Sequence, residues 1–260
     1  MHIARKRFGQ NFLTDQQVIR DIIFAIGPVE TDIMVEIGPG LGALTRPLLE
    51  KLAHLQVVEI DRDIVKRLHD EFSPKRLTIH EADALKFDFA SIGERVRIAG
   101  NLPYNISTPL LFHLSEFSTR VIDMHFMLQK EVVERMVADP GTKDYGRLSV
   151  MLQYSFDMEY MFTVPPEAFR PAPKVESAIV RMIPIAIPRH PVQDYALFAK
   201  IVAAGFGQRR KTLRNTLHEF LSTEDFSYLE IDPQRRAESL PGVEFIRIAN
   251  YVSSKSIENI

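Results

Sequence analysis

The sequence contains no cysteine among its 260 residues. This absence excludes disulfide frameworks, thiolate nucleophiles, zinc ribbons and iron–sulfur ligation, and it is typical of a protein from a reducing compartment. No apolar run reaches the length of about 18 residues that a membrane span requires. The first residues lead into a polar stretch rather than the apolar core of a secretion signal. We therefore expect a cytoplasmic protein that neither spans a membrane nor is secreted.

Two further classes of site are missing. The 8 histidines show no metal-binding spacing such as H-E-x-x-H, and no phosphate-binding loop of the type G-x-x-x-x-G-K-S/T occurs. We therefore expect no metal and no NTPase activity. With 12 Gly, 16 Pro and 45% apolar residues, the chain is neither fibrous nor disordered. Its net charge of −2 does not indicate a nucleic-acid binder, so any basic surface must come from local clustering.

Short apolar segments rich in β-branched or aromatic residues alternate with helical spacings over the first two thirds of the chain. The expected strands cover residues 33–37, 55–60, 76–80, 96–100, 121–128, 159–164 and 177–183. This alternation predicts an α/β fold with one open sheet of seven strands. Beyond a proline-rich stretch at 184–191, apolar residues recur only at helical spacing. We thus expect a sheet domain over residues 1–185 and a small all-helical domain over 186–260.

Three features follow successive expected strands. The first strand runs into Gly38-Pro39-Gly40-Leu41-Gly42, whose third glycine comes one residue earlier than in the dinucleotide fingerprint G-x-G-x-x-G. Glu59 ends the second strand, where a carboxylate can accept from both hydroxyls of a ribose. Asp83 follows the third, where a carboxylate can accept from the amine of an adenine. Singly, each has a structural alternative, a tight turn or a solvated strand end, but together they predict an adenosine-containing cofactor.

The fourth strand ends in Asn101-Leu102-Pro103-Tyr104. An exocyclic adenine nitrogen is a poor nucleophile because its lone pair is delocalised into the ring, and acceptors aimed at its hydrogens make it more nearly tetrahedral. The Asn101 side-chain oxygen and the Leu102 carbonyl can each accept one hydrogen, while Pro103 sets the turn. Tyr104 offers a face on which a base can stack, unless it is simply a half-buried tyrosine at a strand end.

This tetrapeptide resembles that of the ribosomal RNA small-subunit adenine N6,N6-dimethyltransferases. The resemblance extends to residues 7–13, 101–107, 169–175 and 211–215, and covers nearly the whole chain. It implies a class I S-adenosylmethionine-dependent methyltransferase: a Rossmann-like, seven-stranded, mostly parallel sheet with a small C-terminal helical domain. It also implies dimethylation of N6 of two adjacent adenosines near the 3′ end of small-subunit (16S) ribosomal RNA, within a pre-ribosomal 30S particle, with S-adenosylhomocysteine as product.

The resemblance also implies site residues. Its catalytic positions are Asn101, Leu102, Pro103, Tyr104 and Phe169, and its cofactor-binding positions are Asn11, Leu13, Gly38, Gly40, Glu59, Asp83 and Asn101. Asn11 and Leu13 belong to an N-terminal arm that is implied to fold over the cofactor, although an arm that only packs on the sheet would have the same sequence. Phe169, taken singly, is a loop aromatic that fills the core. Its matching flank favours a second stacking face.

Basic residues gather between positions 200 and 218, where no acid occurs: Lys200, Arg209, Arg210, Lys211 and Arg214. The N-terminal arm adds Arg5, Lys6 and Arg7. We expect the arginines of the first cluster to lie on a short helix whose Leu213 and Leu217 face the core, and to contact RNA phosphates together with Lys211. A merely solvated helix face is the alternative. We expect a monomer.

Two other functions remain open at this point. One is a large-subunit antibiotic-resistance methyltransferase, which performs the same chemistry on a different RNA. The other is a non-catalytic assembly or transcription factor that keeps the fold for binding. Residues 211–215 argue against the first, and the intact tetrapeptide 101–104 argues against the second.

Overall fold

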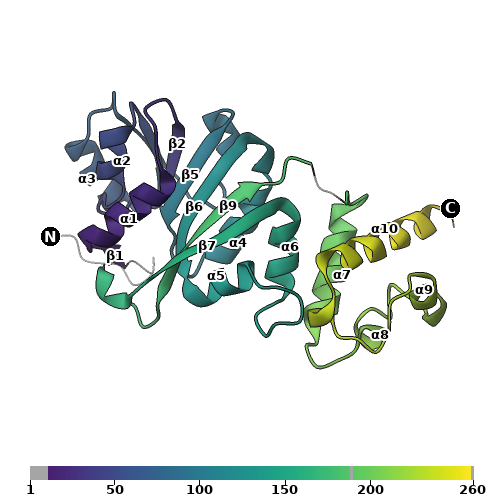
Figure 1. Cartoon of the computed structure of the whole chain (residues 1–260). Coiled ribbons are helices and arrows are strands. Elements are labelled where there is room, and N and C mark those ends of the chain that lie inside the picture. The colour runs from purple at the N-terminus through teal and green to yellow at the C-terminus, as the bar shows by residue number, and fades with distance from the viewer. Residues whose placement is uncertain (1–10, 188–189, 259–260) are drawn as a thin grey trace. The chain divides into compact units, whose positions relative to one another are not determined.

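The computed structural model describes residues 11–187 and 190–258. They form two compact units (Figure 1). The first holds the residues up to Val133 together with Asp157–Pro184, and the second holds Glu134–Phe156 together with the chain from Ile185 onward. Residues 134–156, which the sequence places between strands of the sheet domain, thus group with the C-terminal unit. Across the described ranges, no helix combines the length and apolarity that crossing a bilayer requires.

Seven strands form the main sheet, in the spatial order β4-β3-β2-β5-β6-β9-β7. Their bounds are β2 (Ile33–Ile37), β3 (Leu55–Glu59), β4 (Leu77–Glu81), β5 (Val96–Asn101), β6 (Val121–Gln129), β7 (Phe156–Val164) and β9 (Ser177–Pro184). The pairs from β4 through β6 are parallel, and β9 runs antiparallel to β6. The expected α/β fold with a mostly parallel sheet is confirmed, as is the location of each expected strand.

Helices connect these strands. They are α1 (Gln16–Ile26), α2 (Thr45–Lys51), α3 (Arg62–Glu71), α4 (Ser107–Ser115) and α5 (Lys130–Met136), with the 3₁₀ turns η2 (Phe89–Ile92), η3 (Ser118–Arg120) and η4 (Pro166–Ala168). Asp15 caps the start of α1, where its carboxylate accepts from Gln17 N and Val18 N, and Gly27 caps its end in the left-handed region. Ile19, Ile22 and Ile26 recur on its buried face and join the core beneath it.

A second, two-stranded sheet is absent from the sequence-based expectations. It pairs β1 (Phe12–Leu13) with β8 (Phe169–Arg170) in antiparallel fashion, with Leu13 opposite Phe169. Two residues per strand are too few to produce a period-two pattern, so this pairing depends on tertiary contacts. It holds the segment after residue 11 against the segment that follows β7.

A buried ion network lies among β5, β6 and the chain after α1. The guanidinium of Arg97 bonds Asp123 from Nε (2.8 Å) and Asp32 from Nη1 (2.7 Å), and its Nη2 donates to the Ile26 carbonyl (2.6 Å). Hydrogen bonding to both carboxylates compensates the desolvation of the charge. The network ties the C-terminal end of α1 to the middle of the sheet.

The second unit is helical. Its helices are α6 (Arg147–Ser155), α7 (Tyr195–Gly207), α8 (Leu213–Thr216), α9 (Thr223–Tyr228) and α10 (Gly242–Glu258), with η5 (Ala237–Ser239). Phe198, Phe226 and Phe245 are fully buried in it. The hydroxyl of Tyr145 donates to the Leu240 carbonyl (2.9 Å), which joins the segment before α6 to the segment before α10. The helical pattern expected beyond residue 190 is therefore present.

Beside the Arg97 network, His125 on β6 is buried, and neither ring nitrogen has a hydrogen-bond partner among the described residues. Burial lowers the pKa of His125 to about 4; the charge of Asp123 opposes this shift, whereas Arg97 and Arg181 favour it. The unfolded chain then binds a proton between about pH 6.5 and 4 that the folded protein excludes, so stability falls as the pH falls through this window.

We predict that His125→Phe removes this pH dependence. Relative to the variant, the wild type should lose up to about 3 kcal/mol of unfolding free energy as the pH drops from 6.5 to 4. Thermal melts of both proteins across this range measure the difference. Parallel melting curves at every pH would contradict the assignment.

Candidate active site

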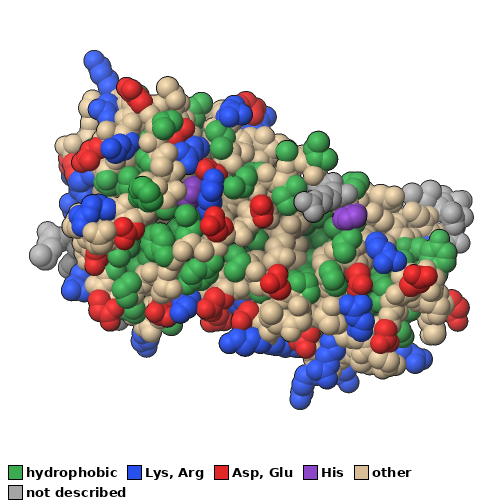
Figure 2. Space-filling model, in the orientation of Figure 1, with side chains coloured by type: hydrophobic (Ala, Val, Ile, Leu, Met, Phe, Trp, Pro, Cys, Tyr) green, Lys and Arg blue, Asp and Glu red, His purple; other side chains and the backbone are tan. Residues whose placement is uncertain are grey.

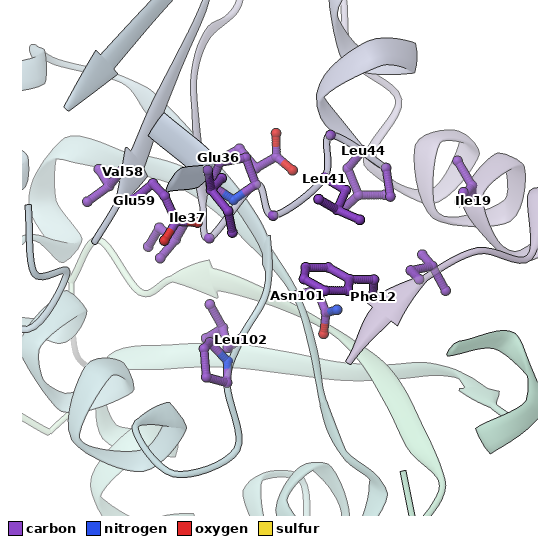
Figure 3. Close-up of a pocket in the computed structure, with 18 of the residues that line it drawn as sticks. Phe12, Ile19, Glu36, Ile37, Leu41, Leu44, Val58, Glu59, Asn101 and Leu102 are labelled. Atoms are coloured by element: carbon purple, nitrogen blue, oxygen red, sulfur yellow. The ribbon is translucent and has the colours of Figure 1, made fainter. Parts of the chain in front are cut away.

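A cavity of about 1170 Å³ opens at the carboxyl ends of the parallel strands of the first unit. Its walls come from the ends of β2 and β3, from residues 82–85 after β4, from residues 101–106 after β5, and from residues 11–14 of the N-terminal segment. Figure 3 shows Glu36, Ile37 and Glu59 on one side of it, and Phe12 and Asn101 on another. Ligands of open α/β sheets bind at this edge.

The glycine loop after β2 forms one wall. Gly38, Gly40 and Gly42 all have positive φ, a backbone conformation that residues with a side chain adopt only with strain. A Cβ at Gly40 would also lie 3.3 Å from the ring of Phe12, so the loop and the N-terminal segment pack tightly against each other. The backbone of this loop is thus open to close approach by a ligand.

Gly100, which the sequence analysis did not single out, brings the two key loops together. A Cβ at this position would collide with the carbonyl oxygen of Ile37 on the neighbouring strand. Only glycine allows β2 and β5 this close approach, and it leaves Gly38 facing the Asn101 carbonyl. A glycine within an expected strand was the available signal.

Glu59 ends β3 and is almost fully buried. Its Oε1 accepts from Ile60 N (2.9 Å) and Asp61 N (2.8 Å), which holds the carboxyl group at the cavity wall. Burial raises its pKa, while these amide bonds lower it. Asp61 instead caps α3, accepting from Asp63 N. Of these two carboxylates, Glu59 therefore lines the cavity and Asp61 does not.

Glu36 is a second buried acid of the cavity that sequence reasoning missed. It lies on β2 and accepts from the Thr45 hydroxyl (2.6 Å). Burial raises its pKa to about 7, and the negative charge of Glu59 adds to the increase. A cation in the cavity would favour the ionised form of both acids. An acid inside an apolar strand was the signal that could have identified it.

Asp83 lines the cavity after β4 and is half-buried. Its Oδ1 accepts from Leu85 N (3.0 Å), which fixes a turn, and the adjacent Ala82 N donates to the Glu59 carbonyl (3.0 Å). The residues expected at the ends of the second and third strands are therefore next to each other on one wall.

Asn101 stands at the end of β5, and its Nδ2 donates to the Asn11 carbonyl (3.2 Å). This bond sets the orientation of the side-chain amide, so that Oδ1 is its remaining acceptor. Leu102 donates its N–H to the Met127 carbonyl (3.1 Å), and Ile106 N donates to the Pro103 carbonyl (3.1 Å). The turn from 101 to 106 is thus held from β6 and from within.

The Tyr104 ring lines the cavity and is half-buried. Burial raises its pKa, so the phenol is protonated at neutral pH. Asn11, Leu13, Gly38, Gly40, Glu59, Asp83 and residues 101–104 all contribute to the same cavity. An acidic wall, a glycine loop, and an asparagine and a tyrosine in one tight turn therefore surround a single space.

Comparison with known proteins identifies this arrangement. The family model described as ribosomal RNA adenine dimethylase matches residues 1–254. The chain belongs to this family. It is 65% identical over 255 residues to a ribosomal RNA small subunit methyltransferase A of Aromatoleum aromaticum, covering 98% of this chain and 96% of the relative. A second protein of that name, from Nitrosospira multiformis, is 64% identical over 250 residues, with 96% of each chain covered.

Solved structures agree with the family assignment. A dimethyladenosine transferase from Plasmodium falciparum superimposes with a TM-score of 0.80 at 25% identity, covering 94% of this chain and 98% of that one. The 23S rRNA methyltransferase ErmE gives a TM-score of 0.72 at 24% identity, covering 94% of this chain and all of that one. The second likeness shows the shared fold alone.

The structure does not bring Phe169 to the cavity of this adenine dimethylase. The side chain is fully buried in the core, opposite Leu13 in the β1–β8 pair, and it is not part of the cavity wall. An open stacking face, which the resemblance implied, is therefore not present in this conformation. Its flanking residues match the family, but the apolar ring packs into the core.

The basic residues of the second unit are placed differently from the expectation. Arg209 and Arg210 lie in the turn between α7 and α8, so only Arg214 is on the short helix; Leu213 and Leu217 are fully buried, as expected. Arg209 donates from Nη2 to the Lys143 carbonyl (2.8 Å) and pairs with Glu238 (3.4 Å). Arg210, Lys211 and Arg214 are exposed.

The basic residues expected in the N-terminal arm, Arg5, Lys6 and Arg7, lie outside the described residues.

Proposed function

We propose that this protein transfers methyl groups from S-adenosylmethionine to N6 of two adjacent adenosines near the 3′ end of small-subunit ribosomal RNA. The observation that carries the proposal is the turn at Asn101–Tyr104, in which Asn11 orients the Asn101 amide and all four residues line one cavity. The names of relatives that are 60% identical and more support the small-subunit RNA as acceptor.

The cavity fits the cofactor. Glu59 would accept from the ribose hydroxyls, Asp83 from the adenine amine, and Gly38 and Gly40 would allow the chain to approach closely. The buried acids Glu36 and Glu59 suit a ligand that carries positive charge. Asn11 and Leu13 would contact its methionine end. When bound, S-adenosylmethionine supplies an electrophilic methyl group on a sulfonium.

The residues after β5 prepare the acceptor nitrogen. Asn101 Oδ1 and the Leu102 carbonyl would each accept one hydrogen of the adenine amine, which directs its lone pair toward the methyl group. Because the Asn101 amide is already held by Asn11, this orientation needs no rearrangement when the base arrives. Transfer to a neutral amine in this geometry needs neither a side-chain base nor a metal.

Tyr104 would stack on the flipped adenine, with a contribution of about 1 to 3 kcal/mol. We retain Phe169 as the second face, on the condition that the β1–β8 pair shifts when a base enters. The pair consists of two residues in each strand, and its opening would also break the bonds from Thr14 N (2.8 Å) and Asp15 N (3.2 Å) to the Ala168 carbonyl. The fully buried ring otherwise cannot meet the base.

The exposed cations Arg210, Lys211 and Arg214 would contact RNA phosphates, and Arg209 would hold the α7–α8 turn against residue 143. Figure 2 shows Lys and Arg side chains gathered along the lower edge of the second unit. We further propose that the sheet domain, expected over residues 1–185, performs the chemistry, and that the helical domain, expected over 186–260 and grouped in the structure with residues 134–156, positions the RNA. We also propose that the enzyme acts as a monomer on a cytoplasmic pre-ribosomal 30S particle.

The activity is tested with a methyl-labelled donor and small ribosomal subunits that lack the modification. We expect label in N6,N6-dimethyladenosine at two adjacent positions near the 3′ end, detected by nucleoside analysis and primer extension. Naked large-subunit RNA serves as the control. Label in the large-subunit RNA alone would indicate the resistance-type enzyme, and donor binding without transfer to either RNA would indicate a non-catalytic binding protein.

Two substitutions separate donor binding from chemistry. Glu59→Ala should weaken donor affinity by about 10- to 100-fold, since it removes charge-assisted hydrogen bonds. Asn101→Ala should chiefly lower the single-turnover rate, by about 100- to 1000-fold, because it removes an acceptor aimed at the amine. Calorimetric titration and rapid-quench measurements give the two quantities. The reverse pattern would overturn the assigned roles.

Salt dependence tests the RNA surface. The double variant Arg210→Gln, Lys211→Gln should reduce the slope of log affinity against log salt by about 1.5 to 2, as two phosphate contacts are lost. The matched control is Lys66→Gln, Lys75→Gln, which changes the net charge equally at exposed positions of the first unit. Equal slopes for the two double variants would show that this surface does not contact RNA.

A further inference from the structure

Tyr104 makes a contact that the chemistry above does not use. Its hydroxyl lies 2.8 Å from the hydroxyl oxygen of Ser177, a residue 73 positions away in the sequence. Ser177 is the first residue of β9 and is fully buried. The bond between Ser177 and Tyr104 therefore joins the turn at residues 101–106, which lines the cavity, to the start of β9.

Ser177 is held firmly. In the β6–β9 ladder it lies opposite Gln129. The preceding residue, Glu176, accepts from Lys130 N through its carbonyl (3.0 Å) and from Lys130 Nζ through its carboxylate (2.8 Å). The start of β9 is therefore fixed both by the sheet and by this ion pair, so the Ser177 hydroxyl is a fixed reference point for any side chain that bonds it.

Tyr104 is fixed at its backbone as well, since its carbonyl accepts from the Ser107 hydroxyl (3.1 Å) at the start of α4. The remaining freedom of the residue is rotation of its side chain. A half-buried aromatic ring without a partner for its hydroxyl would sample several rotamers, and only one orientation can face an entering base. The bond from Ser177 to the phenol selects one.

We propose that Ser177 is a positioning residue for base recognition, which holds the Tyr104 ring in the orientation on which the acceptor adenine stacks. This inference rests on the function proposed above and adds a residue outside the motif 101–104. Ser177 acts through Tyr104 and contacts neither the base nor the cofactor. Fixing the ring beforehand removes an ordering cost from the step in which the base is captured.

A double-mutant cycle tests this role on unmethylated small subunits. Ser177→Ala and Tyr104→Phe should each lower kcat by about 3- to 10-fold while donor affinity stays within twofold of the wild type. The double variant should be no slower than the slower single variant, because both changes remove the same bond. Multiplicative losses, or an unchanged kcat for Ser177→Ala, would overturn the proposal.

Two controls separate positioning from general stability. The Tyr160 and Thr163 hydroxyls form a similar pair (2.7 Å) at an exposed place on β7, and Tyr160→Phe and Thr163→Ala should leave kcat unchanged. Ser177→Thr keeps the hydroxyl and should restore kcat to within about twofold. A Thr variant as slow as the Ala variant, with an equal melting temperature, would assign the effect to packing and overturn the proposal.

A readout in the free protein does not depend on activity. In protein carrying ¹³C-labelled tyrosine, the ring signal that disappears in Tyr104→Phe belongs to Tyr104. Ser177→Ala should move this signal. It should also raise the pKa of Tyr104, because the bond to Ser177 opposes the effect of burial. An unmoved signal overturns the Ser177 contact. A wild type that methylates no small subunit overturns the proposed function instead, and a methylating wild type matched by Ser177→Ala overturns only this inference.

Discussion

The close approach of β2 and β5 at their carboxyl ends is the constraint on which the site depends. Gly100 lies against the Ile37 carbonyl, where no side chain fits. This contact sets Gly38 beside the carbonyl of Asn101. The glycine loop at residues 38–42, proposed to bind the methyl donor, and the turn at residues 101–104, proposed to bind the adenine, therefore face the same cavity. In-line transfer requires such proximity, because the two reacting groups must meet within a few tenths of an ångström of one geometry.

Charge distribution then defines what the cavity can hold. Glu36 and Glu59 are both buried at its wall, and burial raises the pKa of each. The charge of Arg46 opposes this increase for Glu36 only in part, so a positively charged ligand would further favour the ionised form of both acids.

Much of this could be predicted from local pattern. The strand positions followed from short runs of β-branched residues, and the places of Glu59, Asp83 and Asn101 followed from strand ends that converge on one edge. Glu36 and Gly100 were missed, although an acid and a glycine are both unusual residues within a buried strand. The β1–β8 pair was missed because two residues carry no period, and Arg209 was placed on a helix that begins only at Leu213.

The sequence by itself determined the α/β class, the order of strands and helices, and the motif 101–104, because periodicity and strand-end chemistry are local properties of the chain. Tertiary structure alone decided which side chains are exposed and what they bond. It buried Phe169 opposite Leu13, turned Asn101 toward Asn11 and set the Tyr104 hydroxyl on Ser177. These contacts join residues that are 73 positions apart for Tyr104 and Ser177 and 156 apart for Leu13 and Phe169. Such pairings form only when the sheet has assembled.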